Sequence, residues 1–257
     1  MQSMSCVICK GNFSEIVRYP GYGAGTHSLS FDRIGLCSAC GSGTALPRFD
    51  QNTLDAYYAS GAYWDSTDSA QQLVHAANQA KIRLASCLPY VESGIRLRVA
   101  DIGSGYGFIA REAAKAGLHI AGYDFVEPDN SASAHLDSRE LPFPVRRIGS
   151  IGHLDSKADL VFVNQVIEHV ADPVIFLREL ISNAAPGSIF HVETPNSDYR
   201  FKTDVFPHTV FFSTRSFEYI GNKLSVETLL CESFGLWPAP KLTSRGVAQR
   251  LATRALS

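Results

Sequence analysis

The chain has 257 residues, of which 45% are hydrophobic and 19% are charged, a globular composition that allows one large domain and a small accessory one. Its formal net charge of −2 marks neither nucleic acid nor an anionic membrane as an obligate partner. Because the sequence shows no signal peptide and no apolar run of about 18 residues, we expect a soluble cytoplasmic protein without a membrane partner.

Residues 1–48 contain four of the six cysteines, in two Cys-x-x-Cys pairs separated by 27 residues. A glycine shortly after each pair lets the turn fold back, so that backbone N–H groups point at the sulfurs. Four thiolates around one ion form the closed tetrahedral shell of a structural zinc site. We therefore predict a small zinc-ribbon-like module with a hairpin between residues 16–19 and 29–31, whose metal ligands are Cys6, Cys9, Cys37 and Cys40.

Two disulfides or a redox pair are the alternatives for these cysteines. The lack of a signal peptide disfavours disulfides, and a redox pair would not need a second copy. Because fewer than 50 residues cannot bury enough apolar surface alone, we expect the metal to supply folding energy.

Residues 49–93 form a connector that is rich in aromatic side chains. Tyr58, Tyr63 and Trp64 lie within seven positions of one another, and the apolar spacing of residues 69–88 predicts a helix that ends before Pro89. The aromatic residues either pack between the two domains or line a binding pocket.

Residues 97–125 contain an apolar run, a glycine-rich turn, an alanine-rich segment and a second apolar run. This order predicts strand, turn, helix and strand, the first βαβ unit of a Rossmann-like, doubly wound, mostly parallel α/β sheet. Ligands of such sheets bind at the carboxyl ends of the strands. Asp124, which we place at the end of the second strand, can accept hydrogen bonds from a ribose diol, so the pattern predicts a site for a nucleoside cofactor.

The glycine spacing favours one class of nucleoside cofactor. A dinucleotide fingerprint requires a third glycine where this chain has Phe108, which disfavours NAD. The sequence Asp101-Ile-Gly-Ser-Gly-Tyr-Gly107 instead resembles motif I of the class I S-adenosylmethionine-dependent methyltransferases.

Two later segments strengthen this resemblance. Residues 158–173, ending in Val-Ile-Glu-His-Val-Ala-Asp-Pro, and the segment His208-Thr-Val-Phe-Phe-Ser213 are similar to motifs of the subgroup that includes the ubiquinone-biosynthesis O-methyltransferases. Asp172 is expected to cap the helix that Pro173 opens. The resemblance covers about residues 95–236, which implies an S-adenosylmethionine-binding domain over 94–240 and a basic tail over 241–257.

The resemblance implies a set of cofactor contacts. The glycine loop would hold the methionine and ribose parts, and Asp124 would bind the ribose hydroxyls. Phe125 and Ile151 would contact the adenine near the third strand (145–151), and Asn164 and Gln165 would contact the cofactor from the end of the fourth strand. The cofactor-binding residues predicted in this way are Asp101, Gly103, Ser104, Gly105, Tyr106, Gly107, Asp124, Phe125, Ser150, Ile151, Asn164 and Gln165.

The chemistry implied is direct methyl transfer, because the sulfonium of S-adenosylmethionine already activates the methyl group and the protein mainly aligns a nucleophile with it. If the acceptor must lose a proton, His208 is the first candidate for the base, followed by His169 and Glu193. Helices before the sheet often cover the cofactor in this class, so Tyr58, Tyr63 and Trp64 become substrate-pocket candidates.

We expect a small or glycan-like acceptor, with O- or C-methylation favoured. The sequence leaves open the identity of the acceptor and the oligomeric state. A catalytically inactive scaffold, or an RNA-associated protein that uses its zinc module to bind a partner, is the alternative of another class. Only four Lys or Arg residues within 1–48 make a phosphate-tracking surface a poor match.

Overall fold

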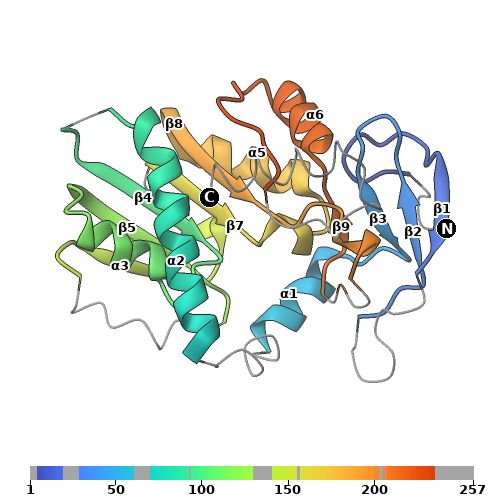
Figure 1. The fold of residues 1–257 in the computed structure, drawn as a ribbon, viewed down its shortest axis with the longest axis horizontal. Coiled ribbons are helices and arrows are strands. Elements are labelled where there is room, and N and C mark those ends of the chain that lie inside the picture. The colour runs from blue at the N-terminus through green and yellow to red at the C-terminus, as the bar shows by residue number, and fades with distance from the viewer. Residues whose placement is uncertain are drawn as a thin grey trace, which may run out of the picture.

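The computed structural model describes residues 5–19, 29–60, 70–92, 94–129, 141–154, 157–202, 205 and 207–234, with the side chains of residues 70–72 left aside. The described chain forms two sheets, shown in Figure 1: a five-stranded sheet of order β6-β5-β4-β7-β8 and a four-stranded sheet of order β1-β2-β3-β9. The first is parallel throughout and the second is antiparallel. This confirms the predicted Rossmann-like fold with a small zinc-ribbon-like domain.

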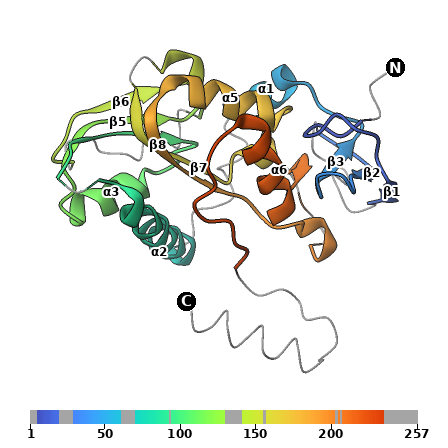
Figure 2. The same ribbon diagram turned by 90° about the horizontal axis from the view of Figure 1, so that it is seen from above.

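Helices cover both faces of the parallel sheet (Figure 2), so its central strands β4 and β7 are almost wholly buried. On one face, α2 and α3 pack over a core that includes Tyr123, Phe125 and Phe162. On the other face, α5 packs over Val161 and Val163. The strands are β4 (Leu97–Ile102), β5 (Ile120–Val126), β6 (Val145–Ile148), β7 (Ala158–Asn164) and β8 (Ala184–Glu193).

The helices follow the local signals in the sequence. The helix predicted over residues 69–88 is α2 (Ala70–Cys87), and a 3₁₀ turn over Leu88–Tyr90 follows it. As predicted, the Asp172 side chain accepts hydrogen bonds from the first turn of α5, which Pro173 opens. The other helices are α1 (Gln51–Ala59), α3 (Phe108–Lys115), α5 (Pro173–Asn183) and α6 (Thr214–Leu224). In the part of the chain that the structure describes, no helix is long and apolar enough to cross a membrane.

The N-terminal sheet departs from the predicted hairpin. Its strands are β1 (Glu15–Arg18), β2 (Arg33–Leu36), β3 (Gly43–Leu46) and β9 (Val210–Phe211). The prediction of a strand at residues 29–31 was wrong, because Leu29 and Phe31 are buried in the core while the ladder begins after them. The fourth strand comes from the far end of the chain, so the sheet joins the cysteine segment to the methyltransferase-like part.

Two strands of the parallel sheet also differ from expectation. β5 continues two residues past Asp124, which therefore lies inside the strand, paired with Arg146 of β6. The third predicted strand ends at Ile148, and a 3₁₀ turn over Ile151–His153 follows it. Both differences move side chains relative to the carboxyl edge of the sheet.

Candidate functional site

The glycine turn lies at the carboxyl end of β4 and runs into α3. Gly103, Gly105 and Gly107 all have positive φ, at 66°, 49° and 68°, a conformation that favours glycine. A Cβ on Gly103 would also lie only 2.5 Å from Cγ2 of Val166. The turn therefore depends on glycine both for its backbone and for its close approach to the segment after β7.

Three polar side chains in or beside this turn are wholly or partly buried. The Ser104 hydroxyl is buried and has no hydrogen-bond partner among the described residues, so it is available to a ligand. Tyr106 is buried, with its ring 6.2 Å from that of Phe108. Asp101 is buried as well and accepts a hydrogen bond from the Tyr123 hydroxyl at 2.9 Å. Burial raises the pKa of Asp101 to about 7, although the Tyr123 hydroxyl acts in the opposite direction.

The carboxylate that contacts the glycine turn is Glu127. Its Oε2 accepts a hydrogen bond from the Gly105 N–H at 2.9 Å, and its Oε1 accepts one from the Asp129 N–H at 3.1 Å. Burial raises the pKa of Glu127. Asp124 instead accepts two hydrogen bonds from Arg146, from Nε and Nη2, each at 2.7 Å. Glu127 was not among the predicted site residues because the strand was expected to end at Asp124, whereas β5 ends at Val126.

The residues predicted around the adenine lie near this edge but in different surroundings. Phe125 is only 2% exposed and its ring lies 4.6 Å from that of Tyr123, in the core of the sheet. Ser150 is exposed and contacts His153, and Ile151 is partly buried. Their contact with an adenine stays a prediction.

At the ends of β7 and β8, polar side chains pair with one another. Oδ1 of Asn164 lies 2.7 Å from Nδ1 of His191. Nε2 of Gln165 donates to Oε1 of Glu193 at 3.1 Å, and Arg83 of α2 binds both Glu193 oxygens. Burial acts to raise the pKa of Glu193, but Arg83 outweighs it and lowers that pKa. A carboxylate held in this way is a poor proton acceptor.

A buried histidine cluster lies beyond β7, where the 3₁₀ turn over Ile167–His169 meets the segment before β9. Nδ1 of His208 lies 2.9 Å from Oδ2 of Asp198, and Nδ1 of His169 lies 2.7 Å from the Tyr58 hydroxyl. The two histidine rings are 5.0 Å apart. Both Glu168 oxygens are buried and have no hydrogen-bond partner in the described chain.

Burial sets the charge states in this cluster. It lowers the pKa of His169 to about 3 and raises that of Glu168 to about 7. Burial also acts to raise the pKa of Asp198, but His208 and Lys202 outweigh it and hold that pKa below its usual value. A pKa of about 3 makes His169 a weak proton acceptor near pH 7, which leaves His208, in contact with the Asp198 carboxylate, as the remaining histidine candidate. Glu168, His169 and His208 each place one ligand atom within 4.8 Å of the others, so the group could also hold a metal ion.

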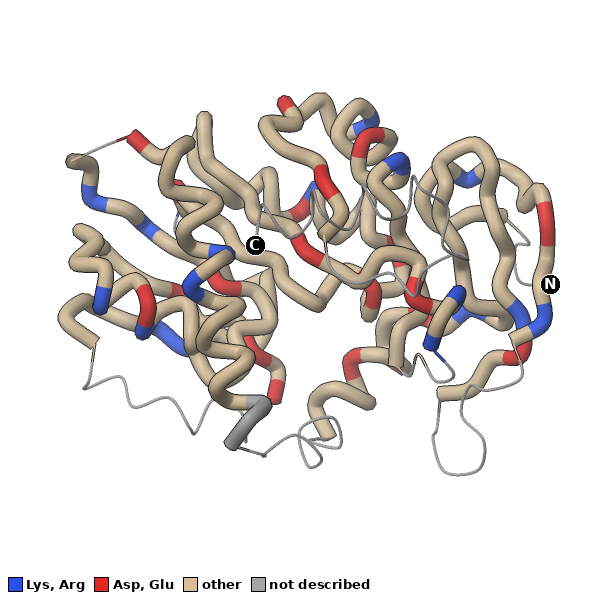
Figure 3. Tube along the Cα trace, in the orientation of Figure 1, with Lys and Arg blue, Asp and Glu red and all other residues tan. Residues whose placement is uncertain are grey.

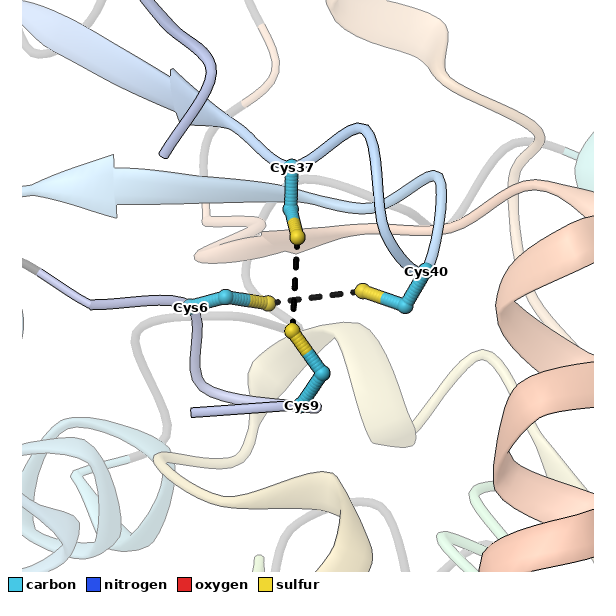
Figure 4. Close-up of side chains that lie close together, drawn as sticks. All are labelled: Cys6, Cys9, Cys37 and Cys40. Atoms are coloured by element: carbon cyan, nitrogen blue, oxygen red, sulfur yellow. Dashed lines mark hydrogen bonds between the residues drawn. The ribbon is translucent and has the colours of Figure 1, made fainter. Parts of the chain in front are cut away.

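The four N-terminal cysteines converge as predicted (Figure 4). Sγ of Cys6 lies 3.5 Å from that of Cys40, and Sγ of Cys9 lies 3.3 Å from that of Cys37. All are free thiols, too far apart for disulfides. A tetrahedral zinc with Zn–S bonds of about 2.3 Å would hold sulfurs about 3.8 Å apart, so the donor set fits the ion. The Gly11 N–H points at the Cys9 sulfur, 3.4 Å away, as the glycine after the first pair suggested.

Of the aromatic residues in the connector, Tyr58 lies in α1 and reaches His169. Tyr63 and Trp64 lie outside the described residues, as does the basic tail over residues 241–257. Their predicted roles therefore stay predictions. The structure also brings in Arg83, Arg146 and Asp198, which no local pattern had marked.

Comparisons with known proteins agree with this geometry. Residues 72–241, more than half of the chain, match the family described as a methyltransferase domain. The ubiquinone biosynthesis O-methyltransferases of Maricaulis maris and Xanthomonas campestris are each 30% identical, over 162 and 156 residues. Each alignment covers 58% of this chain, and 63% and 62% of the relative, so the chain spans just under two thirds of their length.

A solved structure is similar in fold. A SAM-dependent methyltransferase from Leishmania major superposes with a TM-score of 0.54 at 18% identity. The superposition covers 69% of this chain and 75% of that one.

Proposed function

Since the chain belongs to the methyltransferase-domain family, we propose that it is an enzyme that transfers the methyl group of S-adenosylmethionine to a small-molecule acceptor. The observation that carries the proposal is the glycine turn, which needs glycine at Gly103 and presents the buried hydroxyl of Ser104 without a partner among the described residues. These features fit a cofactor that approaches the backbone closely.

The cofactor would lie across the carboxyl ends of β4, β5 and β7. We assign its methionine and ribose parts to the turn and the ribose diol to Glu127, since this carboxylate already contacts Gly105. Asp124 is the alternative ribose ligand, but it lies inside β5, paired with Arg146, and not at the carboxyl end of the strand. Asn164 and Gln165 would face the cofactor from β7.

When bound, S-adenosylmethionine would supply an activated methyl group, which an acceptor hydroxyl oxygen would take in line while the carbon–sulfur bond breaks and its electron pair stays on sulfur, leaving S-adenosylhomocysteine. Nε2 of His208 would accept the hydroxyl proton, with the Nδ1–H of His208 donating to Asp198. The main contribution of the protein is alignment, worth up to about 7–11 kcal/mol when the reactants are well oriented.

The acceptor class follows from the relatives and not from a bound molecule. Both relatives named above are O-methyltransferases of ubiquinone biosynthesis, which favours a hydroxyl acceptor for this chain. A glycan-like acceptor and C-methylation, which the sequence analysis also expected, stay proposals. Acidic and basic residues are interspersed along the described trace (Figure 3), which gives little support to an RNA-associated role.

We further propose that the four cysteines bind a structural zinc ion. The sulfur-only donor set and the closed geometry leave no open position for chemistry on the ion, which supports a folding role.

An acceptor screen tests the proposal. The metal-loaded protein is incubated with methyl-labelled S-adenosylmethionine and panels of phenols, sugars and amines, in parallel with His208→Gln. We expect label transfer to a hydroxyl compound that His208→Gln largely abolishes while it still binds S-adenosylhomocysteine. Transfer to amines that is unaffected by His208→Gln would contradict the assignment of the base.

A further inference from the structure

The segment that carries Asp198 and His208 packs on the N-terminal sheet. Its residues Val205 and Phe211, each 1% exposed, share one buried cluster with side chains of that sheet and of the segments that flank its strands. The Phe211 ring lies 6.2 Å from that of Phe31, and Tyr199 packs edge-on against Phe211 at 5.2 Å. The other members of this cluster are Tyr19, Phe31, Ile34 and Ala45.

Hydrogen bonds fasten both ends of this segment to the N-terminal sheet. The Tyr19 hydroxyl donates to the carbonyl of Lys202 at 2.9 Å, and the Lys202 ammonium lies 3.0 Å from Asp198. At the other end, the Ala45 N–H donates to the carbonyl of Thr209 at 2.9 Å. The Thr209 N–H donates in turn to the carbonyl of Glu168 at 2.8 Å. The residue after His208 is therefore held between β3 and the histidine cluster.

The cysteine cluster is directly connected to these strands. β3 begins three residues after Cys40 and pairs with β9, Thr44 opposite Val210. The Ser42 hydroxyl lies 3.1 Å from the Cys40 sulfur, and the Ser213 hydroxyl, just after β9, donates to the carbonyl of Gly41 at 3.0 Å. In Figure 1, β9 lies beside β3 at the junction of the two sheets.

We infer that the metal-bound cysteine cluster positions His208 for catalysis. The ion fixes the turn between β2 and β3, β3 fixes β9, and β9 fixes the residue next to His208. The inference rests on the proposed function, because it takes His208 as the proton acceptor. It makes the four cysteines positioning residues and not a separate folding unit. It also predicts that metal loss lowers the local stability of the His208 segment more than that of the glycine turn, whose contacts come from β5 and Val166.

Hydrogen exchange of the full-length protein tests this inference. Exchange is followed by mass spectrometry before and after the metal is removed with a chelator, in peptides covering residues 207–212 and 97–102. We expect exchange over 207–212 to rise about tenfold or more while 97–102 and the affinity for S-adenosylhomocysteine change less than about threefold. Unchanged exchange over 207–212 would overturn the inference.

A pair of glycine variants decides the question with the metal in place. A Cβ at Gly43 would lie 3.0 Å from Ile34 Cγ2 and 3.3 Å from Phe211 Cβ, so Gly43→Ala should push β3 away from β9. The control is Gly122→Ala on β5, where the nearest atom is Arg98 Nη1 at 3.6 Å. We expect Gly43→Ala, and not Gly122→Ala, to speed exchange over 207–212. Equal exchange in the two variants would overturn the inference even if the chelated protein unfolds throughout.

Two readouts separate a positioning role from general destabilisation. The ¹⁵N signal of His208 Nδ1, assigned by its loss in His208→Gln, should move in Gly43→Ala because the bond to Asp198 is disturbed. With an acceptor in hand, kcat should fall while KM for S-adenosylmethionine stays the same. If the metal-loaded wild type fails to bind S-adenosylhomocysteine, the proposed function fails, while the exchange result still decides whether the cysteine cluster holds the 207–212 segment.

Discussion

Gly103→Ala is the substitution for which the structure gives the clearest expectation. The residue has a φ of 66°, and an alanine Cβ there would lie 2.5 Å from Cγ2 of Val166. The left-handed conformation costs a non-glycine residue about 1–2 kcal/mol. Displacing a packed side chain costs about 1–3 kcal/mol more. Together these give a loss of about 2–5 kcal/mol, divided between folding stability and the shape of the turn.

Two measurements detect this loss of free energy. In a chain of this size, about 2 kcal/mol lowers the melting temperature by about 4–8 °C. Any part of the strain that is relieved by moving the turn should appear as weaker binding of labelled S-adenosylhomocysteine in equilibrium dialysis, by about tenfold for each 1.4 kcal/mol.

A second substitution separates the two causes. Val166→Ala removes Cγ2, so in the double variant Gly103→Ala/Val166→Ala the contact part of the loss should disappear while the backbone part remains. Val166→Ala alone gives the baseline, and Gly122→Ala controls for a glycine with room for a Cβ. The reasoning is refuted if Gly103→Ala melts within about 1 °C of the wild type and binds the ligand equally well.

Three further predictions concern carboxylates near the glycine turn and in the histidine cluster. Glu127→Ala should weaken S-adenosylhomocysteine binding about tenfold or more, whereas Asp124→Ala should mainly lower the melting temperature by removing the two hydrogen bonds that Arg146 donates to Asp124; the reverse order in dialysis would return the ribose to Asp124. Burial raises the pKa of Asp101 from 3.8 to about 7, so the stability that this group contributes is present below about pH 3.8 and is lost as the pH rises through about 7. Asp101→Asn should therefore gain about 2–3 kcal/mol on the wild type between about pH 5 and 8 in urea denaturation, and a pH-independent difference would contradict the burial argument. Asp198→Asn should lower kcat about a hundredfold with KM for S-adenosylmethionine unchanged, since His208 loses its ionised partner; an equal loss of cofactor affinity would point to a structural role instead.

Local patterns were sufficient for the elements that depend on local chemistry. The order of strand, glycine turn and helix around Gly103 predicted the first βαβ unit, and the Asp172-Pro173 pair predicted the start of α5. The two cysteine pairs predicted their own convergence, because a shared ion is the simplest use of four such thiols.

One error had a signal that could have corrected it. The apolar run of the second strand continues through Phe125 and Val126, so the strand end, and with it the carboxylate at the sheet edge, belonged at Glu127. Reading the run to its last β-forming residue would have added Glu127 to the predicted ribose ligands beside Asp124.

Other features had no local signal because they depend on contacts between distant segments. The pairing of β3 with β9 joins residues 43–44 to 210–211, and the sequence of neither short segment indicates its partner. The pairs Asp198–His208 and Tyr58–His169 likewise exist only because the fold brings separate segments together. The histidines could therefore be predicted from the sequence, but not the groups that orient them.

Binding of the methyl donor by the glycine turn can be measured by isothermal titration of the purified, metal-analysed protein with S-adenosylhomocysteine. We expect one ligand to bind per chain in the micromolar range, with weaker binding in Glu127→Ala and unchanged binding in Gly122→Ala. The absence of binding to protein that carries one zinc per chain would contradict this expectation, and the chain would then be a methyltransferase-like scaffold.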